Sequence, residues 1–450
     1  MNLIATDQQR IIIGLGQTGL SCARYLAAKG LPFMLLDTRD APPNLAAIRS
    51  EFPHVELHCG ELDATLLCRA SEMILSPGVA KDQPAIQAAV AAGVKLSGDI
   101  DLFCQAISAP IVAITGSNAK STVTTLVGQM ALDAGIDTGI GGNLGTPVLD
   151  MLSDGEQQLY VLELSSFQLE TVNDLRATAA TVLNVSPDHL DRYDQSLQLY
   201  YQAKHRVFKG AANVVINRDD PLTSPLVSTG VKISSFGLGR PDLNQFGLIE
   251  QQGQTFLARG LTPLLAVSEL KIQGQHNLAN ALAALALGEA VNIPLESMLH
   301  TLKQFAELKH RCQWVAEKNG INYFNDSKGT NVGATVAAIN GLSATLGEGH
   351  KIVLIAGGVG KGADFRDLDK PLKQAGRALI CIGKDGALID QAVGCLSGQY
   401  AASMTAAVQQ AAALAQPGDI VLLSPACASF DMFSGFPARG DAFIESVEAL

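Results

Sequence analysis

A glycine-bearing loop runs into Lys120-Ser121 where an apolar stretch gives way to a helical pattern. The loop and its flanks read Ile111-Val112-Ala113-Ile114-Thr115-Gly116-Ser117-Asn118-Ala119-Lys120-Ser121-Thr122. The backbone N–H groups of such a loop can hold phosphates, while Lys120 would neutralise the terminal phosphates and the Ser121 hydroxyl would reach Mg²⁺. Ala119 departs from the usual G-x-x-x-x-G-K-[ST] spacing, so a helix N-terminus that binds nothing remains the alternative.

An acid and an imidazole stand at the ends of two later predicted strands. Glu163 precedes Leu164-Ser165-Ser166-Phe167-Gln168, and His189 lies within Ser186-Pro187-Asp188-His189-Leu190-Asp191. Open α/β sheets bind ligands at the carboxyl ends of their strands, where these two side chains could hold Mg²⁺ beside phosphate oxygens. A solvated loop is the alternative for either residue. Lys204 stands in a helical pattern, and the periodicity does not distinguish it from a surface lysine.

A dinucleotide-type fingerprint lies near the N-terminus. It reads Gly14-Leu15-Gly16-Gln17-Thr18-Gly19 between a strand and a helix, and Asp37 follows at the end of the next strand. Glycines allow a diphosphate to approach the helix N-terminus, and the acid can accept a ribose hydroxyl. By itself this pattern fits NAD, another nucleotide, or a tight turn that binds nothing.

Further polar segments stand beside predicted strands or helices. They are Gly274–Asn280, Asn325–Asn331, Gly357–Gly362 and Ser424–Phe430. His276 and Asn277 either cap a helix or face a base. The third segment imitates a phosphate loop but has no Ser or Thr after Lys361, so we interpret it as a turn that carries a cation. The last segment could offer N–H groups to a carboxylate.

Parallel strands joined by helices would bring these motifs together. The first series has strands Arg10–Ile13, Pro32–Leu36 and Met73–Leu75 with helices Gly19–Lys29 and Gln83–Ala92; the second has strands Ile111–Ile114, Tyr160–Leu164, Thr181–Leu183 and Asn213–Ile216 with helices Leu278–Ala290 and Leu295–Phe305; the third has strands Ile321–Phe324, Lys351–Ile355, Ala378–Ile382 and Ile420–Leu423. We predict an α/β fold of three domains, with boundaries at 1–108, 109–308 and 309–450.

Composition limits the class of protein. The 450 residues suit about three domains. The net charge of −11 argues against a nucleic-acid partner, because an acidic surface repels phosphate. Neither a membrane-crossing run nor a signal peptide is evident, and the eight cysteines form no CxxC pair, which predicts a cytoplasmic protein with reduced thiols. The segment His54-Val55-Glu56-Leu57-His58 resembles the zinc-binding motif H-E-x-x-H, but its glutamate is displaced by one position. Pro53 favours an extended segment there, so we do not expect a zinc site.

Together the motifs resemble the Mur ligase family, and within it the branch that adds D-glutamate, over essentially the whole chain. The most specific segments are Ser121–Leu126, Gly141–Gly145, Glu163–Glu170, Asn325–Asn331 and Ser424–Phe433, and the sister ligases differ in the last two. The chain departs from the family pattern at Ala119, where glycine is usual, and at Gly329, where alanine is more usual. The resemblance implies an N-terminal Rossmann-like domain for a UDP-sugar, a central mononucleotide (phosphate-loop) ATPase-type domain, and a C-terminal Rossmann-like domain for D-glutamate and part of ATP.

The resemblance also implies a role for particular residues. Lys120, Glu163, His189 and Lys204 would be catalytic; Gly116, Ser117, Asn118, Ala119, Lys120, Ser121, Thr122, Asn277, Asn280, Arg311, Asp326 and Lys328 would bind ATP; Gln17, Thr18, Gly19, Thr38, Arg39, Gly78 and Asn143 would bind the UDP-sugar; and Thr330, Lys361, Ser429, Phe430 and Phe436 would surround D-glutamate. Ser121 and Glu163 would hold one Mg²⁺, and His189 with Lys204 would serve a second if that lysine is N-carboxylated, as in the family.

The implied reaction is an ATP-dependent ligation. ATP would phosphorylate the free carboxylate of UDP-N-acetylmuramoyl-L-alanine, and the amine of D-glutamate would displace phosphate to form an amide. We expect a monomer acting on small molecules, without nucleic acid or membrane insertion, whose third domain swings about Ala306–Lys309. A nicotinamide-dependent oxidoreductase is the alternative, but it leaves the phosphate loop and the third domain unexplained. A nucleotide switch without ligation would hydrolyse ATP slowly, with no stimulation by D-glutamate.

Overall fold

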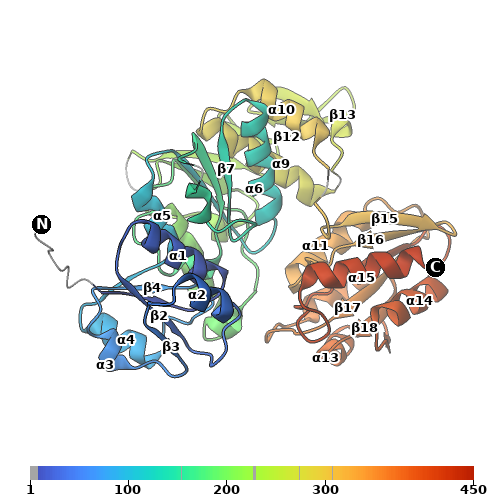
Figure 1. Ribbon diagram of the computed structural model, residues 1–450. Helices are drawn as coiled ribbons and strands as arrows, with labels where there is room; N and C mark the ends of the chain where they lie inside the picture. Colours follow the sequence, from blue (N-terminus) through green and yellow to red (C-terminus); the bar gives the residue numbers. More distant parts are fainter. Residues whose placement is uncertain (1–8, 154, 227–229, 273, 307) are drawn as a thin grey trace, which may run out of the picture.

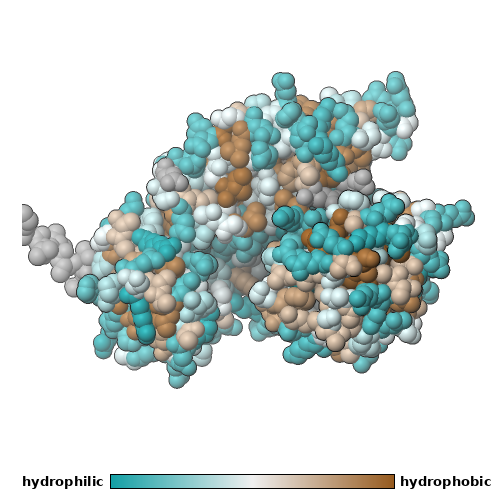
Figure 2. Space-filling view, turned by 45° about the vertical axis from the view of Figure 1, so that its right-hand side comes forward, coloured by the Kyte–Doolittle hydropathy of each residue, from teal (hydrophilic) through white to brown (hydrophobic). Residues whose placement is uncertain are grey.

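Three β-sheets follow one another along the chain, each in its own lobe (Figure 1). The computed structural model describes residues 9–153, 155–226, 230–272, 274–306 and 308–450. The N-terminal and C-terminal lobes both adjoin the central lobe, and Figure 2 shows a hollow between the two outer lobes. This arrangement confirms the predicted α/β fold with three sheets, while the exact domain boundaries remain a prediction.

The N-terminal sheet has the order β3-β2-β1-β4-β5 and is parallel throughout. Its strands are β1 (Arg10–Ile13), β2 (Phe33–Asp37), β3 (Leu57–Cys59), β4 (Glu72–Leu75) and β5 (Lys95–Ser97). Alternate strand residues enter two apolar clusters, one on each face of the sheet. Runs that are apolar at nearly every position form strands of this kind because both faces are covered.

The central sheet has the order β14-β13-β12-β11-β10-β9-β6-β8-β7. Its strands are β6 (Ile111–Thr115), β7 (Thr138–Gly142), β8 (Leu159–Glu163), β9 (Ala179–Val182), β10 (Asn213–Asn217), β11 (Lys232–Phe236), β12 (Gln245–Gln251), β13 (Gln254–Arg259) and β14 (Thr262–Ala266). The last three strands pair antiparallel and were not predicted from the sequence. The short turns at Gln252-Gly253 and Gly260 join these strands, and all three turn residues have positive φ.

The C-terminal sheet has the order β15-β16-β20-β17-β18-β19. Its strands are β15 (Gln313–Lys318), β16 (Ile321–Asn325), β17 (Ile352–Gly357), β18 (Gly376–Ile382), β19 (Gly398–Tyr400) and β20 (Ile420–Leu423). Only β15 pairs antiparallel among these strands. The strands predicted at Arg10–Ile13 and Ile420–Leu423 are confirmed with the same bounds, and the other predicted strands shift at their ends by a few residues.

Helices connect the strands and cover the sheets (Figure 1). They are α1 (Gln17–Ala28), α2 (Leu45–Glu51), α3 (Ala64–Leu67), α4 (Pro84–Ala91), α5 (Asp99–Ala106), α6 (Lys120–Asp133), α7 (Ser166–Leu169), α8 (Leu197–His205), α9 (Gln275–Ala290), α10 (Leu295–Gln304), α11 (Val332–Ser343), α12 (Asp369–Ala375), α13 (Gly386–Ala392), α14 (Met404–Leu414) and α15 (Phe436–Glu448). Among the described residues, no helix combines the length and apolar character needed to cross a bilayer.

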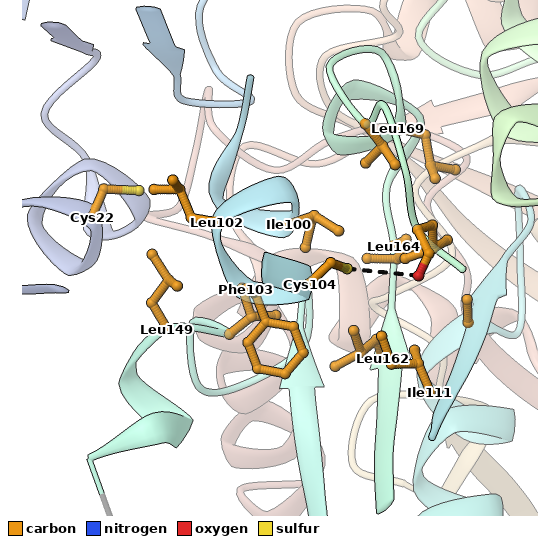
Figure 3. Packing of buried hydrophobic residues seen from close by; sticks show 14 of the residues in the cluster. Cys22, Ile100, Leu102, Phe103, Cys104, Ile111, Leu149, Leu162, Leu164 and Leu169 are labelled. Carbon is orange, nitrogen blue, oxygen red and sulfur yellow. Dashed lines mark hydrogen bonds between the residues drawn. The ribbon is translucent and has the colours of Figure 1, made fainter. Parts of the chain in front are cut away.

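An apolar cluster joins the N-terminal and central lobes. Helix α5 carries Phe103 and Cys104 into a core that also contains Leu162 and Leu164 of the central lobe, and Figure 3 shows these side chains packed together. The Phe103 ring meets the Tyr160 ring edge-on at 4.9 Å between centroids. Burying apolar surface on both sides of this junction stabilises one relative placement of the two lobes.

The contacts between the C-terminal and central lobes include several polar ones near the loop between β6 and α6. Arg311 donates to Ser121, Asn331 exchanges hydrogen bonds with Asn118, and Lys361 pairs with Asp188. The predicted hinge at Ala306–Lys309 includes residue 307, which lies outside the described residues. Polar contacts of this kind are more easily exchanged for ligand contacts than an apolar core is.

Candidate active site

The loop between β6 and α6 joins the end of a buried strand to the N-terminus of a helix. Ser117 and Asn118 donate their backbone N–H groups to the main chain and side chain of Asn184, at 2.9 and 2.8 Å, which fixes the loop against the segment after β9. Lys120 is the first residue of α6, and its Nζ donates to the carbonyl oxygens of Gly116 and Ser117 at 2.8 and 3.0 Å. The helix N-terminus and this cation together favour an anion at the loop.

The structure explains why Ala119 is an unusual residue in this loop. It caps α6 with φ of 65° and ψ of −3°, in the left-handed region. Glycine enters this region without a Cβ penalty, whereas an L-residue loses about 1 kcal/mol or more there. The loop therefore keeps its shape with alanine at the cost of local backbone strain.

Glu163 and Ser121 meet at the base of the loop. Ser121 Oγ donates to Glu163 Oε2 at 2.6 Å, and Asn143 Nδ2 donates to the other carboxylate oxygen at 2.7 Å. Burial opposes ionisation of Glu163, but Lys120, Ser121 and Asn143 outweigh it and lower its pKa. An ionised carboxylate beside a hydroxyl suits Mg²⁺ that is also held by phosphates, because this ion takes few protein ligands. The described residues contain no group of three or more His, Cys, Asp or Glu that could hold a metal alone.

Lys204 is a buried lysine, with 1% of its surface exposed. Its Nζ donates to the Gly116 carbonyl oxygen at 2.9 Å and lies 4.4 Å from the centroid of the Tyr200 ring. Burial lowers its pKa well below the usual lysine value, and the Lys120 cation lowers it further. This burial could not be expected from the sequence, because the helical pattern around Lys204 does not distinguish it from a surface lysine.

His189 lies across the same cavity from the phosphate loop. Its backbone has φ of 52°, and its ring packs edge-on against Phe167, with 5.0 Å between centroids. Burial lowers its pKa to about 4, so the imidazole is neutral near pH 7 and its ring nitrogens can bind a metal. A cavity of about 220 Å³ is lined by Ser117, Asn118, Ala119, Lys120, Ser121, Asn143, Glu163, Ser165, Ser166, Phe167, Asp188, His189, Tyr200, Lys204, Arg311, Lys328, Thr330 and Asn331. The four residues predicted to be catalytic therefore share one cavity.

A neighbouring cavity of about 340 Å³ lies between the central and C-terminal lobes. Of the residues predicted to bind ATP, its lining includes Asn118, Ala119, Thr122, Asn277, Asn280, Arg311, Asp326 and Lys328. Asn280 Nδ2 donates to Asn277 Oδ1 at 3.1 Å, and both side chains are buried. Lys328 Nζ lies 4.1 Å from the Phe436 ring centroid, and burial lowers its pKa to about 8, with Arg311 and Lys120 adding to the shift.

Asp326 is held at the edge of this second cavity. It accepts from Ser424 Oγ at 2.7 Å and from the Cys312 N–H at 3.2 Å, and burial raises its pKa to about 7. A Cβ at Gly329 would lie 2.5 Å from Asp326 Oδ2 and 2.7 Å from Ser424 Oγ. The absence of a side chain at residue 329 therefore makes room for the Asp326–Ser424 hydrogen bond.

The N-terminal lobe carries a third cavity, of about 480 Å³, at the strand ends. It is lined by Gly14, Gly16, Gln17, Thr18, Asp37, Thr38, Arg39, Ser76, Pro77, Gly78, Val79, Gly142, Asn143, Gly145, Pro147 and Gln168. All but one of the residues predicted to bind the UDP-sugar are among them. The exception is Gly19, which packs against the loop, since a Cβ there would lie 2.0 Å from the Gly14 carbonyl oxygen.

Asp37 has partners that differ from the ribose role in the dinucleotide interpretation. Its Oδ2 accepts from the Leu15 N–H at 2.6 Å and from Arg39 Nη2 at 2.7 Å, and Oδ1 accepts from Arg39 Nε at 2.8 Å. Burial opposes ionisation, but these hydrogen bonds lower the pKa of Asp37. The carboxylate therefore fixes the glycine loop and orients Arg39, rather than standing open to a ribose.

The residues predicted to surround D-glutamate do not all come together. Thr330 and Lys361 line the same crevice beside His189, and Phe436 contacts Lys328. Ser429 is buried and Phe430 is 75% exposed, and neither lines a cavity described above. Lys361 is the cation of the turn after β17. Its side chain reaches the central lobe, where Nζ lies 2.5 Å from Asp188 Oδ1.

Three residues of this region were not singled out from the sequence. Asp188 and Asn331 connect the lobes around the phosphate loop, and Arg439 is 1% exposed and donates to the main chain of Ser327 and Cys427. Asp188 and Asn331 are the sequence neighbours of His189 and Thr330 in segments that follow predicted strands, so their position after a strand end could have identified them. Arg439 lies within α15, where nothing in the pattern marks it.

Comparisons with known proteins cover the whole chain. Three family models match: the N-terminal domain of MurD-like Mur ligases over residues 8–98, the Mur ligase middle domain over 114–288, and the glutamate ligase domain of Mur ligases over 310–427. A Pseudomonas aeruginosa protein named UDP-N-acetylmuramoylalanine--D-glutamate ligase is 57% identical over 451 residues, covering 100% of both chains. A Nitrosococcus oceani protein of the same name is 51% identical, covering 98% of this chain and 96% of that one.

Solved structures resemble the fold at low sequence identity. A pseudomurein peptide ligase type C from Methanothermus fervidus has a TM-score of 0.62 at 17% identity, covering 98% of this chain and 99% of that one. A UDP-N-acetylmuramate-alanine ligase from Thermotoga maritima has a TM-score of 0.60 at 18% identity, with the same coverage. These likenesses support the three-lobed architecture.

Proposed function

The chain belongs to the Mur ligase family, and on that premise we propose that it joins D-glutamate to UDP-N-acetylmuramoyl-L-alanine. It is an ATP-dependent carbon–nitrogen ligase that releases ADP and phosphate. The observation that carries this proposal is 57% identity, over the full length of both chains, to a protein named for that reaction. The reaction belongs to the synthesis of peptidoglycan precursors, and we expect a cytoplasmic monomer.

The three cavities lie in an order that would bring the carboxylate of the UDP-sugar substrate and the terminal phosphate of ATP together. The N-terminal cavity would hold the UDP-sugar, and the cavity beside Asn277 and Asn280 would hold the base of ATP. The 220 Å³ cavity between them contains Lys120 and Glu163, and Asn143 lines both it and the N-terminal cavity. The substrate carboxylate and the terminal phosphate of ATP would therefore meet beside Lys120, and acyl phosphate would form there.

Charge explains why cations gather at this meeting point. Two like charges about 4 Å apart repel by about 4 kcal/mol at an effective dielectric of about 20. A carboxylate that approaches a triphosphate makes several such pairs, which Lys120, Lys328 and Arg311 would offset. Phosphoryl transfer depends mainly on positioning and charge neutralisation of this kind.

Mg²⁺ fits the carboxylate and hydroxyl of Glu163 and Ser121, and when bound it would neutralise charge on the phosphates. Arg311 donates to Ser121 Oγ at 2.5 Å in this structure, so its guanidinium would move to a phosphate when the hydroxyl turns to the ion. A second ion needs an anion at Lys204, because an ammonium group cannot bind a metal. N-carboxylation of Lys204 would supply that anion beside the neutral imidazole of His189.

Approach of the C-terminal lobe would complete the site. Asn331, Lys361 and Arg311 reach the phosphate-loop region from that lobe, and acyl phosphate is destroyed by water. Closure of the lobe over the reacting carboxylate would exclude water until the amine attacks.

Phosphate release tests this function directly. The full chain is supplied with ATP, Mg²⁺ and UDP-N-acetylmuramoyl-L-alanine, and D-glutamate, L-glutamate, L-lysine or meso-diaminopimelate is added in separate reactions. We expect release with D-glutamate alone. Phosphate release with another amine would support ligase chemistry but contradict D-glutamate as the substrate. No phosphate release with any of the amines would contradict the ligase function. Lys120→Ala serves as the inactive control.

A further inference from the structure

An ion pair between the lobes stands beside the residues proposed for the amino acid. Lys361 Nζ, from the loop after β17, lies 2.5 Å from Asp188 Oδ1, in the loop after β9. The side chains are 16% and 8% exposed. Both line a narrow crevice together with Thr330, and Asp188 also lines the cavity that holds Lys120 and Glu163. The pair therefore faces the position at which an amine would meet the acyl phosphate.

Each member of the pair is held in place by its own lobe. Gly360, next to Lys361, donates its N–H to Asp385 Oδ2 at 2.7 Å, which fixes the loop that carries the lysine. Asp188 Oδ1 also accepts from the N–H of His189 at 2.9 Å. Each side of the pair therefore keeps a hydrogen bond within its own lobe when the two charges separate.

The charges around this crevice are mostly positive. The larger cavity brings Lys120, Lys328 and Arg311 together. Asp188 is the one carboxylate among the described residues that line the crevice. Glu163, across the cavity, is already engaged by Ser121 and Asn143.

An incoming amino acid carries both signs of charge. Its carboxylates suit a lysine, but its ammonium group would be repelled by the surrounding cations unless a carboxylate faced it. We propose that D-glutamate inserts into the Lys361–Asp188 ion pair, so that a substrate carboxylate binds Lys361 and the substrate ammonium binds Asp188. This inference rests on the proposed function, in which D-glutamate is the amino acid joined, and it assigns the ammonium subsite.

The exchange leaves both side chains paired with a charge of opposite sign, while the second carboxylate of D-glutamate stays outside the pair. Before binding, lysine and aspartate neutralise each other; after binding, each has a partner of opposite sign on the zwitterion. Asn331 Nδ2 donates to Asp188 Oδ2 at 3.2 Å and can keep the carboxylate oriented when Lys361 moves away. Recognition by paired opposite charges would also reject dicarboxylates that lack an amine, because these leave Asp188 unpaired.

Comparing the affinities of D-glutamate and glutarate distinguishes direct binding of the substrate ammonium by Asp188 from a role in which Asp188 only positions Lys361. Glutarate has the same carbon chain and carboxylates but no amine. Each probe is titrated calorimetrically into the full chain loaded with UDP-N-acetylmuramoyl-L-alanine, Mg²⁺ and a non-hydrolysable ATP analogue. In Asp188→Asn we expect D-glutamate to bind about 10- to 100-fold more weakly, the range for a lost charged hydrogen bond, while glutarate binds as well as before or better. Asp188→Ser is the second variant if the amide perturbs folding.

Two further variants complete the test. Lys361→Met should weaken both probes, because both carry carboxylates. Asp364→Asn removes an exposed carboxylate near Lys361 that pairs only with Arg366 among the described residues, and should change neither affinity. Equal weakening of both probes in the Asp188 variants would overturn the inference in favour of positioning of Lys361, and unchanged D-glutamate binding would overturn it outright. Wild-type protein that binds no D-glutamate would instead contradict the proposed function itself.

Discussion

Replacing Lys204 with methionine should raise the thermal stability of the central lobe while abolishing ligation. The Nζ atoms of Lys204 and Lys120 bond the same oxygen of Gly116, at 2.9 and 2.8 Å. They are therefore at most about 5.7 Å apart, the sum of these two distances. Two ammonium charges at that separation repel by about 3 kcal/mol at an effective dielectric of about 20.

Methionine matches the lysine in length and removes both the repulsion and the cost of burying an ammonium group. Lys120 continues to donate to the Gly116 carbonyl, so this oxygen keeps a partner. The substitution loses the contact between the cation and the Tyr200 ring, which is about 1–2 kcal/mol in a desolvated site. The balance predicts a gain of about 2 kcal/mol, or about 4–8 °C in the unfolding temperature for a lobe of this size.

Scanning calorimetry in bicarbonate-free buffer at pH 6 measures this change. Lys209→Met, at an exposed position close in sequence, is the matched control and should stay within about 0.5 kcal/mol of the wild type. The pKa of Lys204 is lowered in the folded protein, so the unfolded chain binds more protons above that pKa. Above that pKa the free energy of unfolding of the wild type therefore rises with pH, and its difference from that of Lys204→Met becomes smaller.

Added bicarbonate distinguishes the chemical states of Lys204. If the lysine is carboxylated, it becomes an anion beside Lys120 and stabilises the wild type, whereas Lys204→Met cannot respond. A lower unfolding temperature for Lys204→Met in bicarbonate-free buffer would refute the argument from charge repulsion. Absence of any bicarbonate effect on wild-type stability and activity would remove the support for carboxylation.

Three other changes test different parts of the structure. The KM for ATP should rise above pH about 8, because burial lowers the pKa of Lys328 to about 8 and its side chain loses its charge above that pH. Lys328→Arg should remove this rise in KM. A wild-type KM for ATP that stays constant up to about pH 9.5 would contradict a role of the Lys328 charge in ATP binding. Gly19→Ala should prevent stable folding of the N-terminal lobe or cost more than about 3 kcal/mol, because its Cβ would lie 2.0 Å from the Gly14 oxygen; unchanged melting and UDP-sugar binding would contradict this. Gly329→Ala should cost about 1–3 kcal/mol and break the Asp326–Ser424 hydrogen bond, measured by thermal unfolding, and an unaltered unfolding temperature would show that the carboxylate shifts freely.

Much of the fold could be predicted because its strands are short apolar runs with turn residues at their ends. The run Ile420–Leu423 is buried at every position and became a strand with the predicted bounds. The strands β12 to β14 were missed because their burial is mixed, and no long apolar run marks them. Antiparallel pairing there follows from two tight turns, which a search for strand–helix alternation does not detect.

The chemical groups at the strand ends can be read from the sequence alone. Three of these groups are local features, recognised by residue type and distance from a strand. They are the loop that ends in Lys120-Ser121, the acid Glu163 and the imidazole of His189. Parallel sheets then bring the strand ends to one edge, so a shared site could be expected.

The charge states of these groups and their partners depend on the folded arrangement of the chain. Lys204 belongs to an ordinary helical pattern, and its lowered pKa exists because other segments bury it and place Lys120 nearby. Asp188 and Lys361 are 173 positions apart in sequence, and they meet because two lobes dock. Desolvation and pairing of charges depend on distances through space, which local sequence patterns do not encode.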